Sequence, residues 1–215
     1  MKMRILIGYD GSESADAALR DLRRAGLPRD VLALIMSVGE LVMPPPAIGD
    51  EVVGRPVTSR LVTEALAQAA AGAAQALKET QEFAAKAGEC VRSYFPHWEV
   101  QTEGLAGWPS TELINKADEW KADLVVVGSQ GRSALGRFFL GSVSKKLATE
   151  SRSSVRVVRR IAEKSDNEPP RIMIGVDGSP GAERAVRSVG RRVWPAGAEV
   201  RIRWSKALSA RRSRS

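Results

Sequence analysis

The sequence predicts an α/β protein with a five-stranded, parallel, doubly wound, Rossmann-like sheet, followed by a partial β-α-β repeat. Two observations predict this fold. Short apolar runs alternate with helix-like segments over residues 1–160, an order typical of parallel sheets with helical crossovers. In addition, residues 171–187 are identical to residues 4–20 at ten of seventeen positions. The opening strand and helix therefore occur twice.

Five segments of the first part have the composition of strands. They are short, rich in branched apolar residues and bounded by glycine, proline or aspartate. The run DLVVVG is apolar almost throughout, as expected for a strand at the centre of a parallel sheet. In chain order the predicted strands are 3–9, 31–38, 97–104, 123–128 and 154–160.

Four helices are predicted between these strands. The first, 14–26, has Ser12 as its N-cap. The second, 58–88, is alanine-rich and places small and apolar residues at three-, four- and seven-residue spacings, as in a long amphipathic helix. The third, 109–120, has proline in its first turn, and the fourth covers residues 142–151.

The chain divides into four predicted parts. A domain over 1–160 is followed by a polar linker over 161–170, a truncated second copy over 171–204 and a basic tail over 205–215 that we expect to be disordered. The second copy contains only a strand, a helix and a strand. A decayed tandem domain, a frameshifted end and a half-domain that needs a partner chain all remain open.

The net charge of +8 is unevenly distributed. Residues 1–150 hold 17 basic and 19 acidic residues, whereas residues 151–215 hold 16 and 6. The body of the protein is therefore not basic, and nucleic acid is not expected as a partner. A nucleic-acid role of the tail is a third alternative, which predicts strong salt dependence of binding.

The composition also bounds the compartment. The longest apolar runs fall short of the ~18 residues of a membrane span, and the chain opens directly on a strand-like pattern. Cys90 is the only cysteine, so an internal disulfide is excluded. We expect a cytoplasmic protein without a membrane partner.

A glycine-rich stretch, GSQGRSALGRFFLGS, covers residues 128–142 directly after the predicted central strand. In an open parallel sheet, ligands bind beyond the carboxyl ends of the strands. The stretch is neither a Walker A loop nor the dinucleotide fingerprint GxGxxG. Turn and helix-cap glycines are the plain alternative to a ligand site.

The glycines predict a cradle for phosphates. Gly128 and Gly131 let main-chain amides approach a ligand without a side chain in the way. Gly141 precedes a helix whose first amides have no intrahelical partner and favour anions. The hydroxyl groups of Ser142 and Ser144 add hydrogen-bond donors.

Two motifs resemble those of the universal stress protein family. Its ATP-binding members carry Gly-x2-Gly-x9-Gly-Ser/Thr after the fourth strand, a spacing met by Gly128, Gly131, Gly141 and Ser142. The family's first strand ends in Asp-Gly-Ser, like Asp10-Gly11-Ser12. The resemblance covers residues 3–160 as a full domain and 171–204 as the front of a second, so the chain resembles a tandem repeat.

The resemblance implies an adenine-nucleotide alpha-hydrolase-like fold that binds ATP, with a divalent cation such as Mg²⁺. Asp10 would lie beside the nucleoside, and Val38 would offer main-chain groups to the adenine. Val127 and Gly128 would line the ribose side. The phosphates would be held by Gly131, Gly141, Ser142, Val143 and Ser144.

Some features depart from the family pattern or allow a second interpretation. Gln130 replaces a basic residue often found there, which predicts weaker phosphate binding, and Arg132 is placed to compensate. Asp10 could instead only cap the following helix. The segment 39–57, with three consecutive prolines, is either a flap over the site or a disordered insertion. Asp177, the counterpart of Asp10 in the second copy, is expected to bind nothing.

The expected function is a cytoplasmic sensor or regulator of the stress response that binds ATP or a related adenine nucleotide. We expect a protein that is not an enzyme beyond slow incidental ATP hydrolysis, with no catalytic residues and no metal site among its residues. No paired base and nucleophile is visible, no cysteine or histidine stands near His97 to share a metal, and Cys90 is expected to be an inert thiol. The alternative is a dimeric interaction module of the same fold that binds no nucleotide. The resemblance also implies pairing of the fifth strand with a counterpart, so a homodimer across 154–160 is expected.

Overall fold

The computed structural model describes residues 2–40, 59–131, 140–159 and 168–204, and for 59–66 the helical backbone alone. The chain forms two units: residues 1–19 with 30–160, and residues 20–29 with 161–215. The predicted basic tail, most of the linker and most of the segment 39–57 lie outside the described residues.

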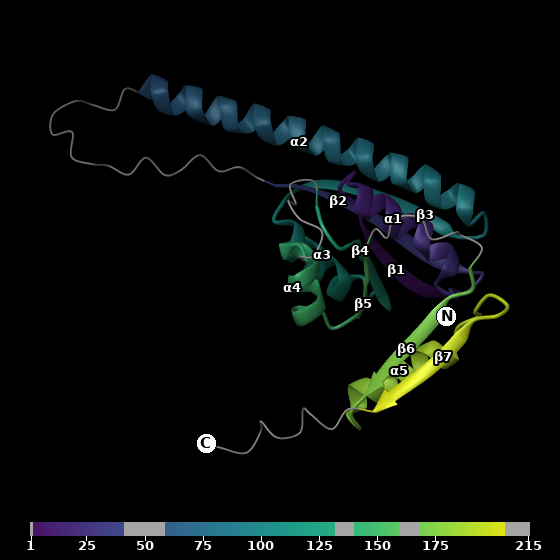
Figure 1. Ribbon diagram of the computed structural model, residues 1–215. Coiled ribbons are helices and arrows are strands. Elements are labelled where there is room, and N and C mark those ends of the chain that lie inside the picture. The colour runs from purple at the N-terminus through teal and green to yellow at the C-terminus, as the bar shows by residue number, and fades with distance from the viewer. Residues whose placement is uncertain (1, 41–58, 132–139, 160–167, 205–215) are drawn as a thin grey trace, which may run out of the picture. The chain divides into compact units, whose positions relative to one another are not determined.

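Five parallel strands form the sheet of the first unit in the order β3-β2-β1-β4-β5 (Figure 1). β1 lies at the centre and pairs with β2 on one side and β4 on the other. The predicted doubly wound parallel sheet is therefore confirmed. The strands are β1 (Met3–Gly8), β2 (Val31–Glu40), β3 (Glu99–Gly107), β4 (Leu124–Gly128) and β5 (Ser154–Val158).

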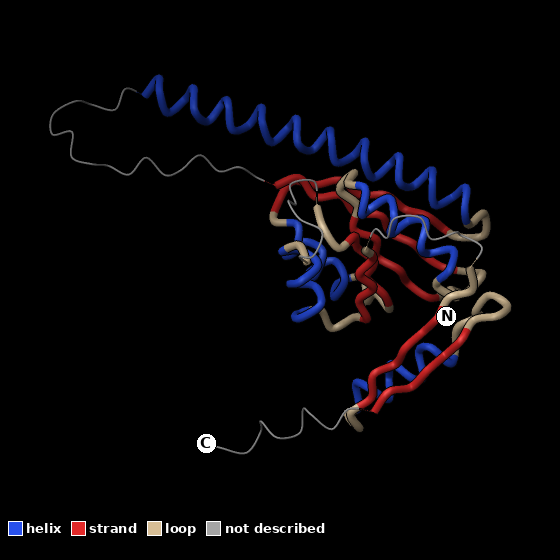
Figure 2. The backbone as a smooth tube through the Cα atoms, viewed as in Figure 1, coloured by secondary structure: helices blue, strands red, loops and turns tan. Residues whose placement is uncertain are grey.

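Helices cover both faces of this sheet (Figure 2). The crossovers from β1 to β2 and β3 run outward in one direction, and those from β3 to β4 and β5 run in the other. With right-handed connections, the first two helices lie on one face and the last two on the opposite face. In chain order they are α1 (Glu13–Asp21), α2 (Ser59–Tyr94), α3 (Pro109–Glu119) and α4 (Ser142–Glu150).

The core lies on both sides of the central strands. Ile5, Leu6 and Ile7 of β1 are all fully buried, because successive side chains of a strand point to opposite faces and both faces carry helices. The core between the sheet and the α3 and α4 helices is made of apolar side chains from three strands and both helices, including Leu6, Leu34, Met36, Val125, Val127, Leu113 and Leu147.

Several predicted boundaries were wrong by a few residues. α2 continues past Gly88 to Tyr94, because burial of Val91 outweighs the low helix propensity of glycine. β2 continues through Gly39 and Glu40, which pair with the end of β3. β3 begins two residues later than predicted, at Glu99, and β5 ends at Val158 rather than at residue 160.

Gly72 of α2 offers a test of helix propensity. A Cβ at this position would meet no described atom within 4 Å, so alanine adds no clash with the described residues and removes glycine's extra backbone freedom. We expect Gly72→Ala to raise the local opening free energy of this part of α2 by about 1 kcal/mol. Native-state hydrogen exchange of the surrounding amides measures it, and unchanged or faster exchange would contradict the expectation.

The described part of the second unit contains a short 3₁₀ helix at Leu22–Arg24 and, as predicted for 171–204, a strand, a helix and a strand. These are β6 (Arg171–Val176), α5 (Pro180–Gly190) and β7 (Glu199–Trp204). The two strands pair in parallel, and α5 packs on β6. Ile174 is the one large apolar side chain of these strands that is buried.

The two copies differ on one face of their sheets. Leu6 pairs with Leu34 and Gly8 with Met36 in the first copy, and both Leu34 and Met36 are buried in the core. At the same register the second copy pairs Met173 with Arg201 and Gly175 with Arg203.

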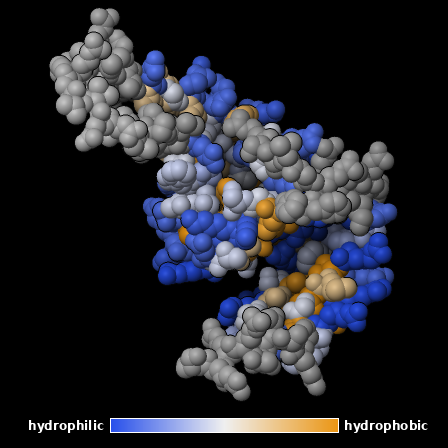
Figure 3. All heavy atoms as spheres, turned by 60° about the vertical axis from the view of Figure 1, so that its left-hand side comes forward, coloured by the Kyte–Doolittle hydropathy of each residue, from blue (hydrophilic) through white to orange (hydrophobic). Residues whose placement is uncertain are grey.

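Both of these arginines are exposed, so this face of the second copy is not an apolar core face. On the opposite face of β7, Val200, Ile202 and Trp204 are 46%, 58% and 64% exposed. Figure 3 shows hydrophobic atoms at the surface beside hydrophilic ones.

Candidate functional site

A pocket of about 470 Å³ opens at the carboxyl ends of β1, β2 and β4. β1 and β4 are neighbours in the sheet, but the chain leaves them toward opposite edges. Their carboxyl ends therefore form the topological switch point, where open α/β sheets bind ligands. The first turns of α3 and α4, at Pro109 and Ser142, complete the wall.

Ten of the eleven predicted site residues line this single pocket. Arg132 lies outside the described residues. The structure therefore brings the predicted set together, whereas contact with a nucleotide stays a prediction. The ten residues are Asp10, Val38, Val127, Gly128, Gln130, Gly131, Gly141, Ser142, Val143 and Ser144.

Six lining residues were not singled out from the sequence. Strand periodicity could have found Met36 and Glu40, because they alternate with Val38 on one face of β2. Gly8 and Tyr9 directly precede Asp10. Pro109 and Leu113 of α3 carry no sequence signal for the site, since the packing of α3 brings them there. All six are Gly8, Tyr9, Met36, Glu40, Pro109 and Leu113.

The start of α4 provides main-chain donors. Gly141 is the N-cap, and the first α4 bond runs from Lys145 N to Gly141 O over 2.9 Å. The amides of Ser142, Val143 and Ser144 precede this bond, so they have no intrahelical acceptor. All three residues line the pocket, where the helix dipole favours an anion.

The hydroxyl of Ser144 does not serve as the predicted donor to the pocket. It is 2% exposed, and its single hydrogen is shared between Ser129 O at 3.1 Å and Gly141 O at 3.0 Å. Gly141 N also donates to Ser129 O, over 2.8 Å. Ser144 thus joins the end of the glycine-rich stretch to its beginning, and its main-chain amide is the group left for a ligand.

The glycines have different reasons to be glycine. A Cβ on Gly128 would lie 2.5 Å from Ser14 Oγ and 2.8 Å from Ala15 N. Gly128 therefore permits α1 to pack against the end of β4, which corrects the expectation that it opens the main chain to a ligand. A Cβ on Gly131 would meet one described atom within 4 Å, Asp10 Oδ2 at 3.1 Å, so protein packing does not demand glycine there.

Asp10 lies both in the turn before α1 and at the pocket, whereas its contact with a nucleoside stays a prediction. Its Oδ1 accepts a hydrogen bond from Ser12 N over 3.0 Å, which stabilises the turn before α1. Gly11 adopts the left-handed conformation in this turn, with φ of 77°. The other oxygen, Oδ2, lies beside Gly131 at the pocket.

Tyr9 fixes the end of β1 to the helical layer behind it. Its hydroxyl donates to Asp16 Oδ1 over 2.6 Å, and its ring makes an edge contact with Phe83 of α2. Burial, together with the hydrogen bond to Asp16, raises the pKa of Tyr9 far above its ordinary value. The side chain therefore stays neutral and anchors the Asp10 turn.

Other groups give little sign of chemistry. Within the described residues, no group of three or more His, Cys, Asp and Glu side chains is arranged to hold a metal ion. Cys90 is partly buried as a free thiol, and His97 is exposed. None of the helices in the described ranges is long and apolar enough to cross a membrane.

Comparison with known proteins shows to which family the chain belongs. Residues 1–159 match the model of the universal stress protein family. The chain belongs to this family. It is 28% identical over 191 residues to universal stress protein Rv2005c of Mycobacterium tuberculosis, a match that covers 84% of this chain and 56% of that protein.

Two further similarities agree with the family assignment. Universal stress protein MJ0531 of Methanocaldococcus jannaschii is 38% identical over 61 residues, which is 28% of this chain and 36% of that protein. The chain thus spans about half, or less, of the length of these two relatives. The solved structure of hypothetical protein MJ0577 shares the fold, with a TM-score of 0.58 and 18% identity over 76% of this chain and 99% of that one.

Proposed function

We propose that this universal stress protein binds ATP or a related adenine nucleotide in the switch-point pocket and acts in the cytoplasm as a sensor or regulator of the stress response. The observation that carries the proposal is the convergence of Gly131, Gly141 and the first turn of α4 on one pocket. Such a helix start takes phosphate through its free amides and its dipole. A single cysteine fits a reducing compartment.

The lining of the pocket is chemically mixed, as a nucleotide needs. Val38, with the buried Met36 and Leu113, contributes apolar lining for a base, whereas the first turn of α4 supplies donors for phosphates. A volume of about 470 Å³ lies within the ordinary range for small-molecule sites. Mg²⁺ commonly binds through phosphate oxygens and one or two carboxylates, and Asp10 is the carboxylate beside Gly131 that could supply the protein ligand.

Native mass spectrometry of the purified protein, followed by equilibrium binding of labelled ATP with Mg²⁺, tests the proposal. We expect nucleotide to be carried through purification or to bind saturably at one site per chain. Absence of both would contradict the proposal and favour the interaction module that binds no nucleotide.

We further propose a homodimer through β5. β5 is an edge strand of the sheet, so one side of its main chain has no strand partner among the described residues. Pairing with the same strand of a second copy would satisfy these groups with two-fold symmetry. Sedimentation at micromolar concentration should give twice the mass of one chain, and a monomer would contradict the proposal.

A further inference from the structure

Ser14 of α1 forms hydrogen bonds with both main-chain groups of Gln130 in the glycine-rich stretch. Its Oγ accepts a hydrogen bond from Gln130 N over 3.2 Å and donates to Gln130 O. Ser12 Oγ lies 3.3 Å from the same carbonyl oxygen as a further donor. Ser14 is 7% exposed, so water competes little for these bonds.

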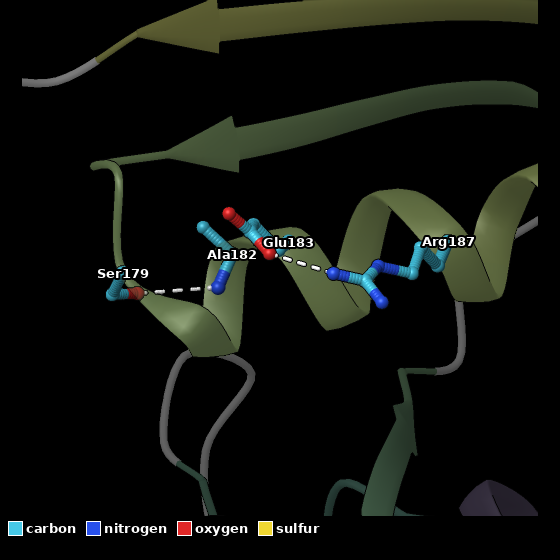
Figure 4. Close-up of polar contacts among 4 residues, drawn as sticks. All are labelled: Ser179, Ala182, Glu183 and Arg187. Carbon is cyan, nitrogen blue, oxygen red and sulfur yellow. Dashed lines mark hydrogen bonds and ion pairs between the residues drawn. The ribbon is translucent and has the colours of Figure 1, made fainter.

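The second copy has the same Asp-Gly-Ser turn as the first, so comparing the two copies shows which hydrogen bonds belong to that turn. Asp177 Oδ1 accepts from Ser179 N over 2.9 Å, as Asp10 does from Ser12 in the first copy. Hydrogen bonding with Ser179, first with its side chain and then with its main-chain amide, lowers the pKa of Asp177. Figure 4 shows Ser179 capping α5 by accepting from Ala182 N over 3.2 Å, with the Glu183–Arg187 ion pair one turn further on.

The equivalent cap in the first copy is Ser12 Oγ, which accepts from Ala15 N over 3.2 Å. The position of Ser14, however, is occupied by Gly181 in the second copy. The Asp-Gly-Ser turn therefore serves the helix start in both copies. The Ser14 hydroxyl, which bonds both main-chain groups of Gln130, has no counterpart in the second copy, whereas Ser12 corresponds to Ser179.

We propose that Ser14 is a positioning residue for the phosphate end of the pocket, a role that rests on the proposed nucleotide binding. The C=O and N–H of a trans peptide point in opposite directions. Because Ser14 holds the carbonyl of Gln130 on the α1 side, the next amide, that of Gly131, points away from α1. Gly131 lines the pocket, so the orientation of its amide is set before a phosphate arrives.

Ser14→Ala tests this inference by comparing ATP with adenosine, which has the base and ribose but no phosphate. Loss of the hydroxyl removes the two hydrogen bonds that Ser14 makes to Gln130 and leaves the longer contact of Ser12 Oγ with Gln130 O, so the peptide is held less firmly. We expect ATP to bind about tenfold more weakly to the variant, and adenosine to bind as it does to the original protein. Ser179→Ala, the same kind of change in the equivalent turn of the second copy, should alter neither affinity.

A second measurement does not depend on a ligand. Hydrogen exchange of the Gln130 amide should become about tenfold faster in Ser14→Ala, because its acceptor is gone. Ser14→Gly copies the residue that the second copy carries at this position. It should show the same faster exchange of the Gln130 amide, and it replaces Ser14→Ala in the experiment if the alanine variant folds poorly.

Each outcome decides the matter. Weaker ATP binding with unchanged adenosine binding supports the positioning role. An equal loss of affinity for both ligands in Ser14→Ala, or no loss for either, overturns the positioning role. Neither result contradicts nucleotide binding by the original protein. If the original protein binds neither ligand, the proposed function fails, and with it the positioning of a phosphate, even where the Gln130 amide exchanges faster.

Discussion

Gly131→Val should weaken ATP binding about a hundredfold while the protein stays folded. A Cβ at this position meets only Asp10 Oδ2 within 4 Å among the described atoms, so the branched side chain would lie at the pocket rather than in the core. It would separate a phosphate from the adjacent main-chain donors. Loss of two charge-assisted hydrogen bonds, each contributing about 1.5–3 kcal/mol, gives at least this factor. Titration with labelled ATP and Mg²⁺ measures it.

Two companion variants make this experiment specific. Gly175→Val is the matched control, because a Cβ on Gly175 of β6 meets no described atom within 4 Å, and it should leave ATP affinity unchanged. Gly141→Val should also abolish tight binding, although its Cβ would lie 3.3 Å from Ser129 O and so disturb the loop itself. Undiminished affinity of Gly131→Val would rule out the phosphate cradle.

Gly104→Ala should cause the largest loss of stability among single alanine substitutions at glycine. Its Cβ would lie 2.5 Å from Gln81 N and 2.7 Å from Thr80 C, both main-chain atoms of α2. A helix backbone cannot move aside as a flexible side chain can, so α2 must shift as a unit. We expect the free energy of unfolding to fall by about 3 kcal/mol, the upper end of ordinary overpacking. Urea unfolding followed by circular dichroism measures it.

Gly72→Ala in α2 is the control for the substitution at Gly104 of β3. It adds the same methyl group where no described atom lies within 4 Å. A free energy of unfolding that is equally reduced in both variants, or unchanged in Gly104→Ala, would show that α2 does not pack on β3 as closely as described.

The order of strands and helices could be predicted because it depends on local patterns. The apolar segments around Ile5 and Val125 are buried strands, as their composition indicates. The position of the pocket could also be predicted, because the carboxyl ends of parallel strands meet at one edge of the sheet. The residues that the glycine spacing indicated line one pocket in the structure.

Tertiary packing explains what the sequence could not reveal. Gly88 marks a helix end in a propensity argument, but burial of Val91 one turn later carries α2 onward. Gly128 was assigned to a ligand, yet the neighbour that requires it is α1. The hydroxyl of Ser144 satisfies two carbonyl groups that become neighbours only when the loop folds back.

The two arginines on one face of β7 constrain how the duplicated segment can be used. An apolar helix packed over Arg201 and Arg203 would remove water from two guanidinium ions, at a cost of several kcal/mol for each ion. The positions that Leu34 and Met36 fill in the first copy carry positive charge in the second. Whatever covers that side of β7 must supply carboxylates to the two guanidinium groups or leave them in contact with water.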